Sequence, residues 1–84
     1  MSRVMIIDDD PDILRFCETV LEPLGHEVIC AGDPNEAILT LQKHAVDLMI
    51  VDIIMPTASG FDLLRTLHKI PNFKLPPVLM LTRR

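Results

Sequence analysis

The sequence predicts an α/β domain built on a parallel sheet, with strands and helices alternating in the order βαβαβαβ. Short apolar runs at 4–7 and 48–51 are rich in β-branched residues, which is typical of strands covered on both faces, and the run at 78–81 is fully apolar. The segments between the runs have a helical spacing of apolar residues and begin with capping residues or proline. We therefore expect helices on both faces of the sheet, joined by right-handed crossovers.

The first strand is expected over 3–8 and is followed by a helix. Asp10 is its predicted N-cap and Pro11 its first helical residue. Pro23 falls in the last turn and should distort it, and Gly25 should end it. One face of this helix is predicted to be apolar: Ile13, Phe16, Cys17, Val20, Leu21 and Leu24.

The second strand is expected over 26–31, where polar residues suit an edge of the sheet. Residues 33–36 have the spacing of a capping box and begin the second helix. The buried side of this helix should comprise Ala37, Ile38 and Leu41. A third strand is expected over 47–52.

A loop over 55–60 should lead into the third helix, which Ser59 and Asp62 are placed to cap. Pro71 should end this helix, and a fourth strand is expected over 78–82. The apolar residues of the helix are Phe61, Leu64 and Leu67, with His68 a further candidate.

Composition excludes several classes of protein. The 84 residues suffice for one domain, and 12 acidic against 8 basic residues give a net charge of −4, which argues against binding nucleic acid. No apolar run approaches the roughly 20 residues of a membrane span. Cys17 and Cys30 lack metal-ligand spacing, so we expect two reduced, buried thiols in a cytoplasmic protein.

Three aspartates follow two of the predicted strands. Asp8 and Asp9 end the first apolar run, and Asp52 ends the run at 48–51. Ligands of parallel sheets bind outside the carboxyl ends of the strands, so neighbouring strands would gather three carboxylates there. Three like charges repel, so such a cluster needs a bound cation or a shifted pKa, and carboxylate oxygens suit Mg²⁺.

These residues resemble the receiver domain of bacterial two-component response regulators. The resemblance covers residues 1–84 as a single, partial receiver domain. Its motifs are Asp8-Asp9 after a strand, then Asp52-Ile53-Ile54-Met55-Pro56 followed by Gly60, and Leu81-Thr82 at the end of the fourth strand.

The resemblance implies a role for each motif residue. Asp52 would accept a phosphoryl group from a histidine kinase or phosphotransfer protein, and Thr82 would be the switch hydroxyl. Asp8, Asp9, Asp52 and the backbone carbonyl of Ile54 would hold Mg²⁺. The domain would be a regulatory module of a phosphorelay, not a turnover enzyme.

The resemblance also implies a flavodoxin-like, CheY-like fold whose full strand order is 2-1-3-4-5. The 84 residues account for order 2-1-3-4 and lack the fifth strand and the last two helices. The family's strand-five lysine has no counterpart in them. Arg83 stands where the family usually has a small residue.

Two alternatives remain at this stage. A truncated receiver would fold by oligomerisation and be inactive in signalling. Alternatively, Asp8-x-Asp10 after an apolar strand resembles the haloacid-dehalogenase phosphatases, although Asp12 stands where that family has Thr or Val.

The missing elements predict self-association. Without a fifth strand, 78–81 becomes a sheet edge with unpaired backbone groups. Without the last helix, apolar residues of the first helix would lie open, among them Phe16 and Val20. We expect a dimer or higher oligomer through the fourth strand and first helix, with the two fourth strands antiparallel if the dimer is symmetric.

Overall fold

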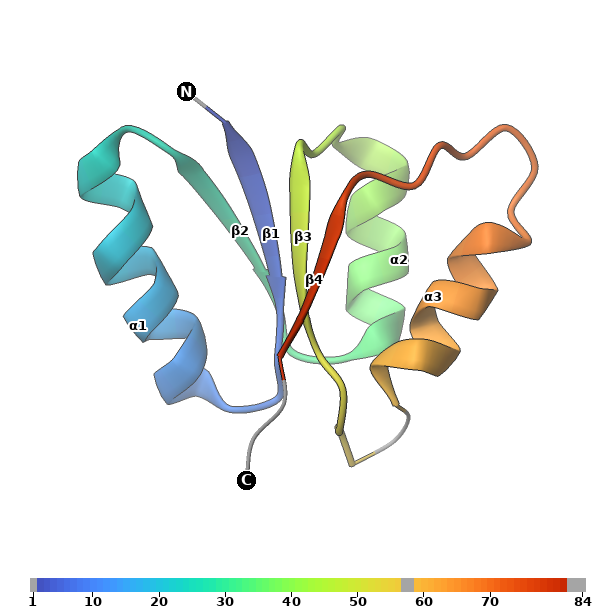
Figure 1. The fold of residues 1–84 in the computed structure, drawn as a ribbon, viewed down its shortest axis with the longest axis horizontal. Helices are drawn as coiled ribbons and strands as arrows, with labels where there is room; N and C mark the ends of the chain where they lie inside the picture. Colours follow the sequence, from blue (N-terminus) through green and yellow to red (C-terminus); the bar gives the residue numbers. More distant parts are fainter. Residues whose placement is uncertain (1, 57–58, 82–84) are drawn as a thin grey trace.

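The computed structural model describes residues 2–56 and 59–81 and shows a four-stranded parallel sheet of order β2-β1-β3-β4. The alternation of strands and helices and the strand order predicted from sequence are confirmed (Figure 1). The elements are β1 Arg3–Ile7, α1 Pro11–Leu21, β2 Glu27–Ala31, α2 Pro34–Lys43, β3 Leu48–Asp52, α3 Gly60–His68 and β4 Val78–Leu81, with a 3-10 turn, η1, at Glu22–Leu24.

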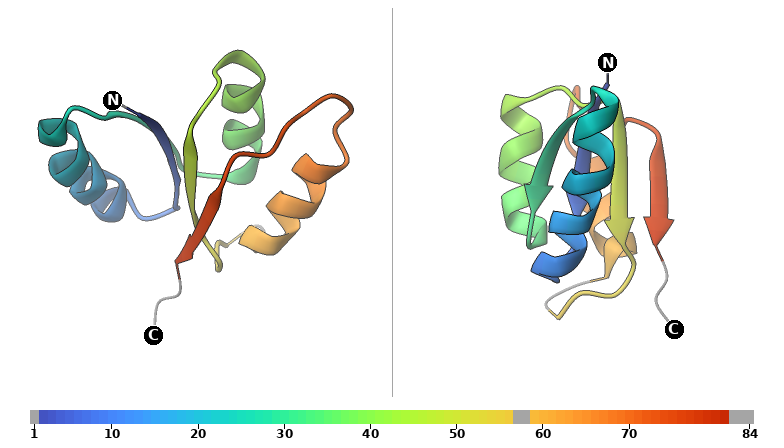
Figure 2. Two further views of the ribbon diagram at one scale, coloured as in Figure 1. Left: turned by 45° about the horizontal axis from the view of Figure 1, so that its top comes forward. Right: turned by 90° about the vertical axis from the view of Figure 1, so that its left-hand side faces the viewer.

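The helices lie on both sides of the sheet. α1 covers one face, while α2 and α3 cover the other (Figure 1). β2 and β4 form the two edges, and Figure 2 shows β4 at the margin farthest from β2. The expectation that residues 26–31 form an edge strand is therefore confirmed.

The main core lies between the sheet and the pair α2 and α3. The fully buried side chains of Met5, Met49, Leu63 and Leu67 form its centre. Other buried members are Ile7, Ala31, Ala37, Leu41, Val51 and Met55. Methionines thus serve as packing residues, since a flexible thioether fills irregular space.

The α1 side of the sheet is covered much less completely. No residue of α1 is buried, and its predicted apolar face is split. Ile13, Cys17 and Leu21 are half-buried, but Phe16 is 65% exposed and Val20 45% exposed. The prediction that this part of α1 lies open is confirmed for Phe16 and Val20.

Helix boundaries follow the predicted capping signals. The Asp10 carboxylate accepts the N–H of Asp12 at the start of α1. Pro23 ends the regular helix in a 3-10 turn, and Gly25 follows with φ +92°, a left-handed conformation that glycine adopts at low cost. In α2, Asp33 accepts the N–H of Glu36.

The buried side of α3 includes one of the apolar residues singled out in the sequence, Leu67, and adds Leu63. Phe61, by contrast, is exposed, and Leu64 is half-buried. His68 is exposed as well. The helix turns 100° per residue, so Leu63 and Leu67, four residues apart, share the side toward the sheet.

The two thiols are half-buried, not buried as predicted. Desolvation, followed by the nearby charge of Glu18, raises the pKa of Cys30 to about 11, and desolvation with the Asp8 charge raises the pKa of Cys17. Partial burial of the two thiols therefore disfavours their thiolate forms.

Candidate metal centre

The three predicted aspartates meet at the carboxyl ends of the two central strands. β1 and β3 are neighbours, and their register pairs Ile7 with Val51. Continuing the register by one residue places Asp8 beside Asp52. Adjacent parallel strands thus bring together residues that are 44 positions apart in the sequence.

The cluster is compact and largely withdrawn from water. One ligand atom from each of Asp8, Asp9 and Asp52 lies within 4.8 Å of the others. Asp8 is 0% exposed and Asp52 1% exposed, while Asp9 faces solvent. Like charges at this separation repel strongly in a partly desolvated site, so the cluster favours a cation among its oxygens.

Backbone donors orient both buried carboxylates. The N–H of Asp10 donates to Oδ1 of Asp8 over 2.9 Å, and the N–H of Ile54 donates to Oδ1 of Asp52 over 3.3 Å. Each bond spans two residues, as in an Asx turn. The short turns after β1 and β3 therefore restrict how each carboxylate can rotate.

Gly60 closes the loop that follows β3. Its N–H donates to the Ile53 carbonyl over 2.7 Å, and Ile54 forms a bridge with Ser59. A Cβ atom at Gly60 would lie 2.5 Å from the Asp52 carbonyl oxygen and 2.9 Å from Val51. Only glycine permits α3 to begin this close to the end of β3.

Ser59 and Asp62 fix the start of α3 with the complete capping box that the sequence predicts. The Ser59 hydroxyl accepts the N–H of Asp62, and the Asp62 carboxylate accepts the N–H of Ser59. These bonds, with the Arg65 side chain, hold the pKa of Asp62 below its ordinary value. The loop beside Asp52 is thereby anchored at its far end.

The donor set fits a hard divalent cation. Three carboxylates at adjoining strand ends supply oxygen ligands, which Mg²⁺ takes together with water. Ile54 lies in the same loop, and its side chain is 72% exposed. Thr82, predicted as the switch hydroxyl, and Arg83 lie outside the described residues.

Asp10 is a cap, not a member of the cluster. Its carboxylate accepts the N–H of Asp12, in agreement with the interpretation from sequence. The steric role of Gly60 was missed, because a motif glycine does not reveal which backbone it approaches. The signal available in the sequence was its position eight residues after Asp52.

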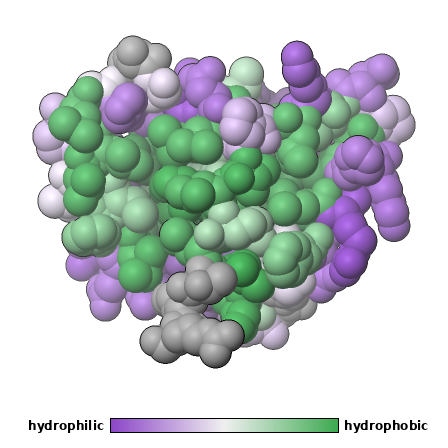
Figure 3. All heavy atoms as spheres, viewed as in Figure 1, coloured by the Kyte–Doolittle hydropathy of each residue, from purple (hydrophilic) through white to green (hydrophobic). Residues whose placement is uncertain are grey.

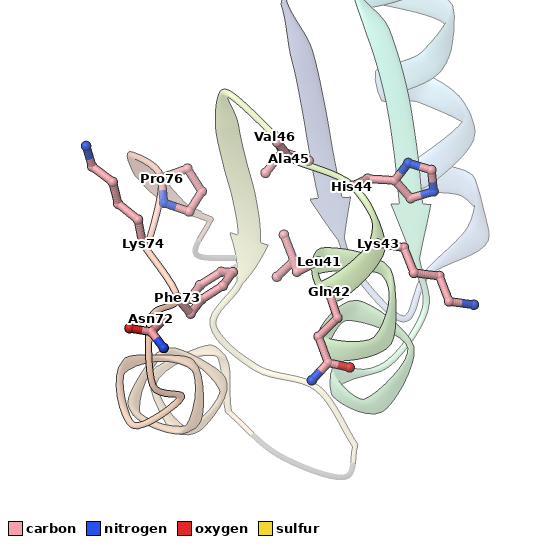
Figure 4. Close-up of a pocket in the computed structure, with 10 residues that line it drawn as sticks. All are labelled: Leu41, Gln42, Lys43, His44, Ala45, Val46, Asn72, Phe73, Lys74 and Pro76. Carbon is pink, nitrogen blue, oxygen red and sulfur yellow. The ribbon is translucent and has the colours of Figure 1, made fainter.

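A second hollow lies elsewhere, between the end of α2 and the segment that precedes β4. It measures about 300 Å³, and Leu41, Phe73 and Val46 are among its lining residues. Figure 4 shows the side chains of Lys43 and Lys74 pointing away from it. Since its charged groups diverge, the aspartate cluster is the better candidate for chemistry.

A family model described as the response regulator receiver domain matches residues 4–84. The chain belongs to this family. Among its relatives are the heme response regulator HssR of Staphylococcus saprophyticus, 38% identical, and the transcriptional regulatory protein CpxR of Escherichia coli, 34% identical. Both matches cover 100% of this chain but only 36% of HssR and 34% of CpxR, so the receiver chain spans about a third of each.

Solved receiver structures have the same fold. The chemotaxis response regulator CheY4 of Vibrio cholerae superposes with a TM-score of 0.90 at 33% identity, over 100% of this chain and 70% of CheY4. The response regulator TrrA of Thermotoga maritima, solved in complex with Mg²⁺ and BeF, has a TM-score of 0.83 at 29% identity, over 98% of this chain and 70% of TrrA. The CheY-like prediction is confirmed.

Because the chain belongs to the receiver family, the phosphatase alternative is no longer needed. Asp10, the second aspartate of that reading, is occupied in capping α1. No helix within the described residues is long and apolar enough to cross a membrane.

Proposed function

We propose that this receiver domain accepts a phosphoryl group on Asp52 from a histidine kinase or phosphotransfer protein, with Mg²⁺ held by Asp8, Asp9, Asp52 and the Ile54 carbonyl. The observation that carries the proposal is the compact cluster of Asp8, Asp9 and Asp52 at the carboxyl edge of the sheet. A cytoplasmic location and a phosphorelay role accord with membership of the family.

The chemistry follows from charge. A carboxylate is a weak nucleophile, and a phosphorylated donor is anionic, so the two repel. Mg²⁺ held by Asp8, Asp9 and Asp52 would supply positive charge that offsets this repulsion. Asp52 provides the accepting oxygen, and the Ile54 N–H keeps that carboxylate oriented.

Two steps test the metal site and the acceptor separately. The chain has no Trp or Tyr, so Mg²⁺ binding is best followed by NMR or calorimetry. We expect Asp9→Ala and Asp52→Asn each to weaken Mg²⁺ binding about tenfold or more. Glu22→Gln, on an exposed residue outside the cluster, serves as the matched control and should bind Mg²⁺ normally.

Phosphorylation is then measured by intact mass after incubation with acetyl phosphate and Mg²⁺. One added phosphoryl group that is absent from Asp52→Asn would support the acceptor assignment. Unchanged Mg²⁺ titration in both site variants would show that the metal assignment is wrong.

A receiver that is inactive in signalling is the second candidate. In this case Mg²⁺ would bind to the cluster, but neither acetyl phosphate nor beryllofluoride would react at Asp52. The phosphorylation measurement therefore separates the candidates.

We also propose that copies of the 84-residue chain associate through β4 and α1. β4 pairs with β3 on one side, and no other strand of the described residues pairs with its outer edge. Leu79 on this strand is 53% exposed. An open strand edge beside exposed apolar side chains promotes association.

A further inference from the structure

The open surface around β4 has two different halves. β4 lies between α1 and α3, and Figure 3, seen from the same side as Figure 1, shows apolar side chains from the α1 side across the centre toward α3. One half contains a stripe on α1 and η1, and the other a groove beside α3. The two halves differ in shape and in charge.

The α1 stripe consists of Phe16, Val20 and Leu24, which are 65%, 45% and 69% exposed. Phe16 and Val20 are four residues apart on α1, so they lie on the same side of the helix, and Leu24 follows in the 3-10 turn η1. The segment 11–24 carries three acidic residues and one basic residue, Asp12, Glu18 and Glu22 against Arg15. The stripe is therefore an apolar ridge on a negatively charged helix.

The α3 groove is complementary in both respects. It has a volume of about 470 Å³, an apolar lining that includes Phe61, Leu64 and Leu75, and a rim of Arg65, His68 and Lys69. Phe61 is 52% exposed. The segment 60–77 carries one acidic residue and three basic residues, Asp62 against Arg65, Lys69 and Lys74. Because Asp62 and Arg65 form an ion pair, the net positive charge of the segment comes from Lys69, which lines the groove, and from Lys74, which precedes β4.

Symmetry decides which halves meet when two copies face each other. A twofold axis parallel to β4 exchanges left and right in Figure 1, so the α1 stripe of each copy faces the α3 groove of the other. A twofold axis perpendicular to β4, as antiparallel strand pairing requires, sets α1 against α1 and α3 against α3. Segments of like net charge then face each other, which disfavours this arrangement.

We propose that two copies form a closed dimer whose axis runs parallel to β4, with the α1 stripe of each copy seated in the α3 groove of its partner. The inference rests on the proposed self-association and is independent of phosphorylation. A helix ridge in an apolar groove is a common mode of recognition, and the opposite charges set its direction. Each dimer contains two identical stripe–groove contacts.

Two single variants test this arrangement. Phe16→Asp disrupts the stripe and leaves the groove intact, whereas Phe61→Asp disrupts the groove and leaves the stripe intact. Both residues are exposed, so circular dichroism should show an unchanged fold. Leu39→Asp is the matched control, because Leu39 is 60% exposed on α2 and belongs to neither half.

Sedimentation equilibrium and light scattering provide the measurement. We expect the unmodified chain and Leu39→Asp to form a dimer, and each Phe→Asp variant alone to dimerise at least about tenfold more weakly. An equimolar mixture of the two variants should recover a dimer. In the mixed dimer, an intact stripe from one chain meets an intact groove from the other.

Three results would overturn the proposal. The first is a monomer at all concentrations, and the second is an assembly that grows with concentration without closing at two copies. The third is weakened dimerisation in both variants with no recovery on mixing, because that is the behaviour of a dimer in which like halves meet.

Discussion

The two faces of the sheet differ in how they are covered. On the α2 and α3 side, Met5, Met49 and Leu67 are 0% exposed and form one continuous core. On the other side, a single helix with no buried residue lies over the sheet, and its Phe16 faces solvent. The stability of this chain therefore comes mainly from the α2 and α3 face, and we infer that its capacity for association comes from the α1 face.

The packed face also supports the candidate metal centre. Met80 and Val51 lie against Gly60, at the point where α3 begins beside the Asp52 backbone. Met55 is buried in the same core. The loop that follows Asp52 is thus packed against the closed core, which would suit a site that needs fixed geometry.

The largest expected difference between the faces is in the cost of deleting a side chain. Leu67→Ala should lower the free energy of unfolding by about 2–5 kcal/mol, since it leaves a cavity in a closed core. Phe16→Ala should change it by no more than about 0.5 kcal/mol at concentrations below association. Urea titration of both variants measures the free energy of unfolding. Equal losses would show that the two faces contribute equally to stability.

Gly60→Ala tests the contact between the packed face and the metal centre. The added methyl group would lie 2.5 Å from the Asp52 carbonyl oxygen, so the loop must shift. We expect a loss of about 1–3 kcal/mol in stability and weaker Mg²⁺ binding.

Gly32→Ala is the matched control for this substitution. The nearest atom to a Cβ there is Oε1 of Glu36 at 3.8 Å, an ordinary contact. Mg²⁺ binding should be unchanged in Gly32→Ala. If Gly60→Ala also bound Mg²⁺ normally, the close packing at Gly60 would not affect the metal centre, and this prediction would be wrong.

Ile54, in the loop that follows β3, provides a test of how long a phosphoryl group would stay on Asp52. Its exposed side chain follows Asp52 by two residues and has no polar atom to hold a hydrolytic water. We expect a long-lived acyl phosphate in a phosphorylated form, and Ile54→Asn should shorten its lifetime roughly tenfold by positioning water. Phosphate release over time is the readout, and identical lifetimes would contradict the prediction.

The smallest effect concerns the α3 cap. The hydrogen bonds to Ser59, and then the Arg65 side chain, hold the pKa of Asp62 below its ordinary value of 3.8. Because the pKa of Asp62 is depressed in the folded state, its ionised form stabilises the fold at pH values above the unfolded pKa. This contribution is lost as the pH falls below 3.8 and through the folded pKa.

We therefore expect Asp62→Asn to show a smaller loss of urea stability in this acidic range than the unmodified chain. The matched variant Ser59→Ala removes the hydroxyl but keeps the backbone N–H that is the main cause of the shift, so its dependence should lie between those of Asp62→Asn and the unmodified chain. A dependence as steep in both variants as in the unmodified chain would assign it to other carboxylates.

The sequence alone determined the order of elements, their caps and the meeting of the three aspartates. Asp10, Pro23 and Gly25 act on local backbone, so their effects do not depend on distant parts of the chain. Asp8 and Asp52 could be predicted to meet because parallel strands end at one edge. Their roles in phosphorylation, and that of Thr82, stay predictions.

Tertiary structure alone decided which apolar residues are buried. Phe16 and Leu21 both belong to the predicted apolar face of α1, yet only the side of the helix that points toward the sheet is covered. The proximity of Gly60 to the Asp52 carbonyl, and the separation of the acidic segment 11–24 from the basic segment 60–77 across β4, likewise depend on the assembled sheet. Helical periodicity shows that a face is apolar, but burial depends on which elements are present to cover it.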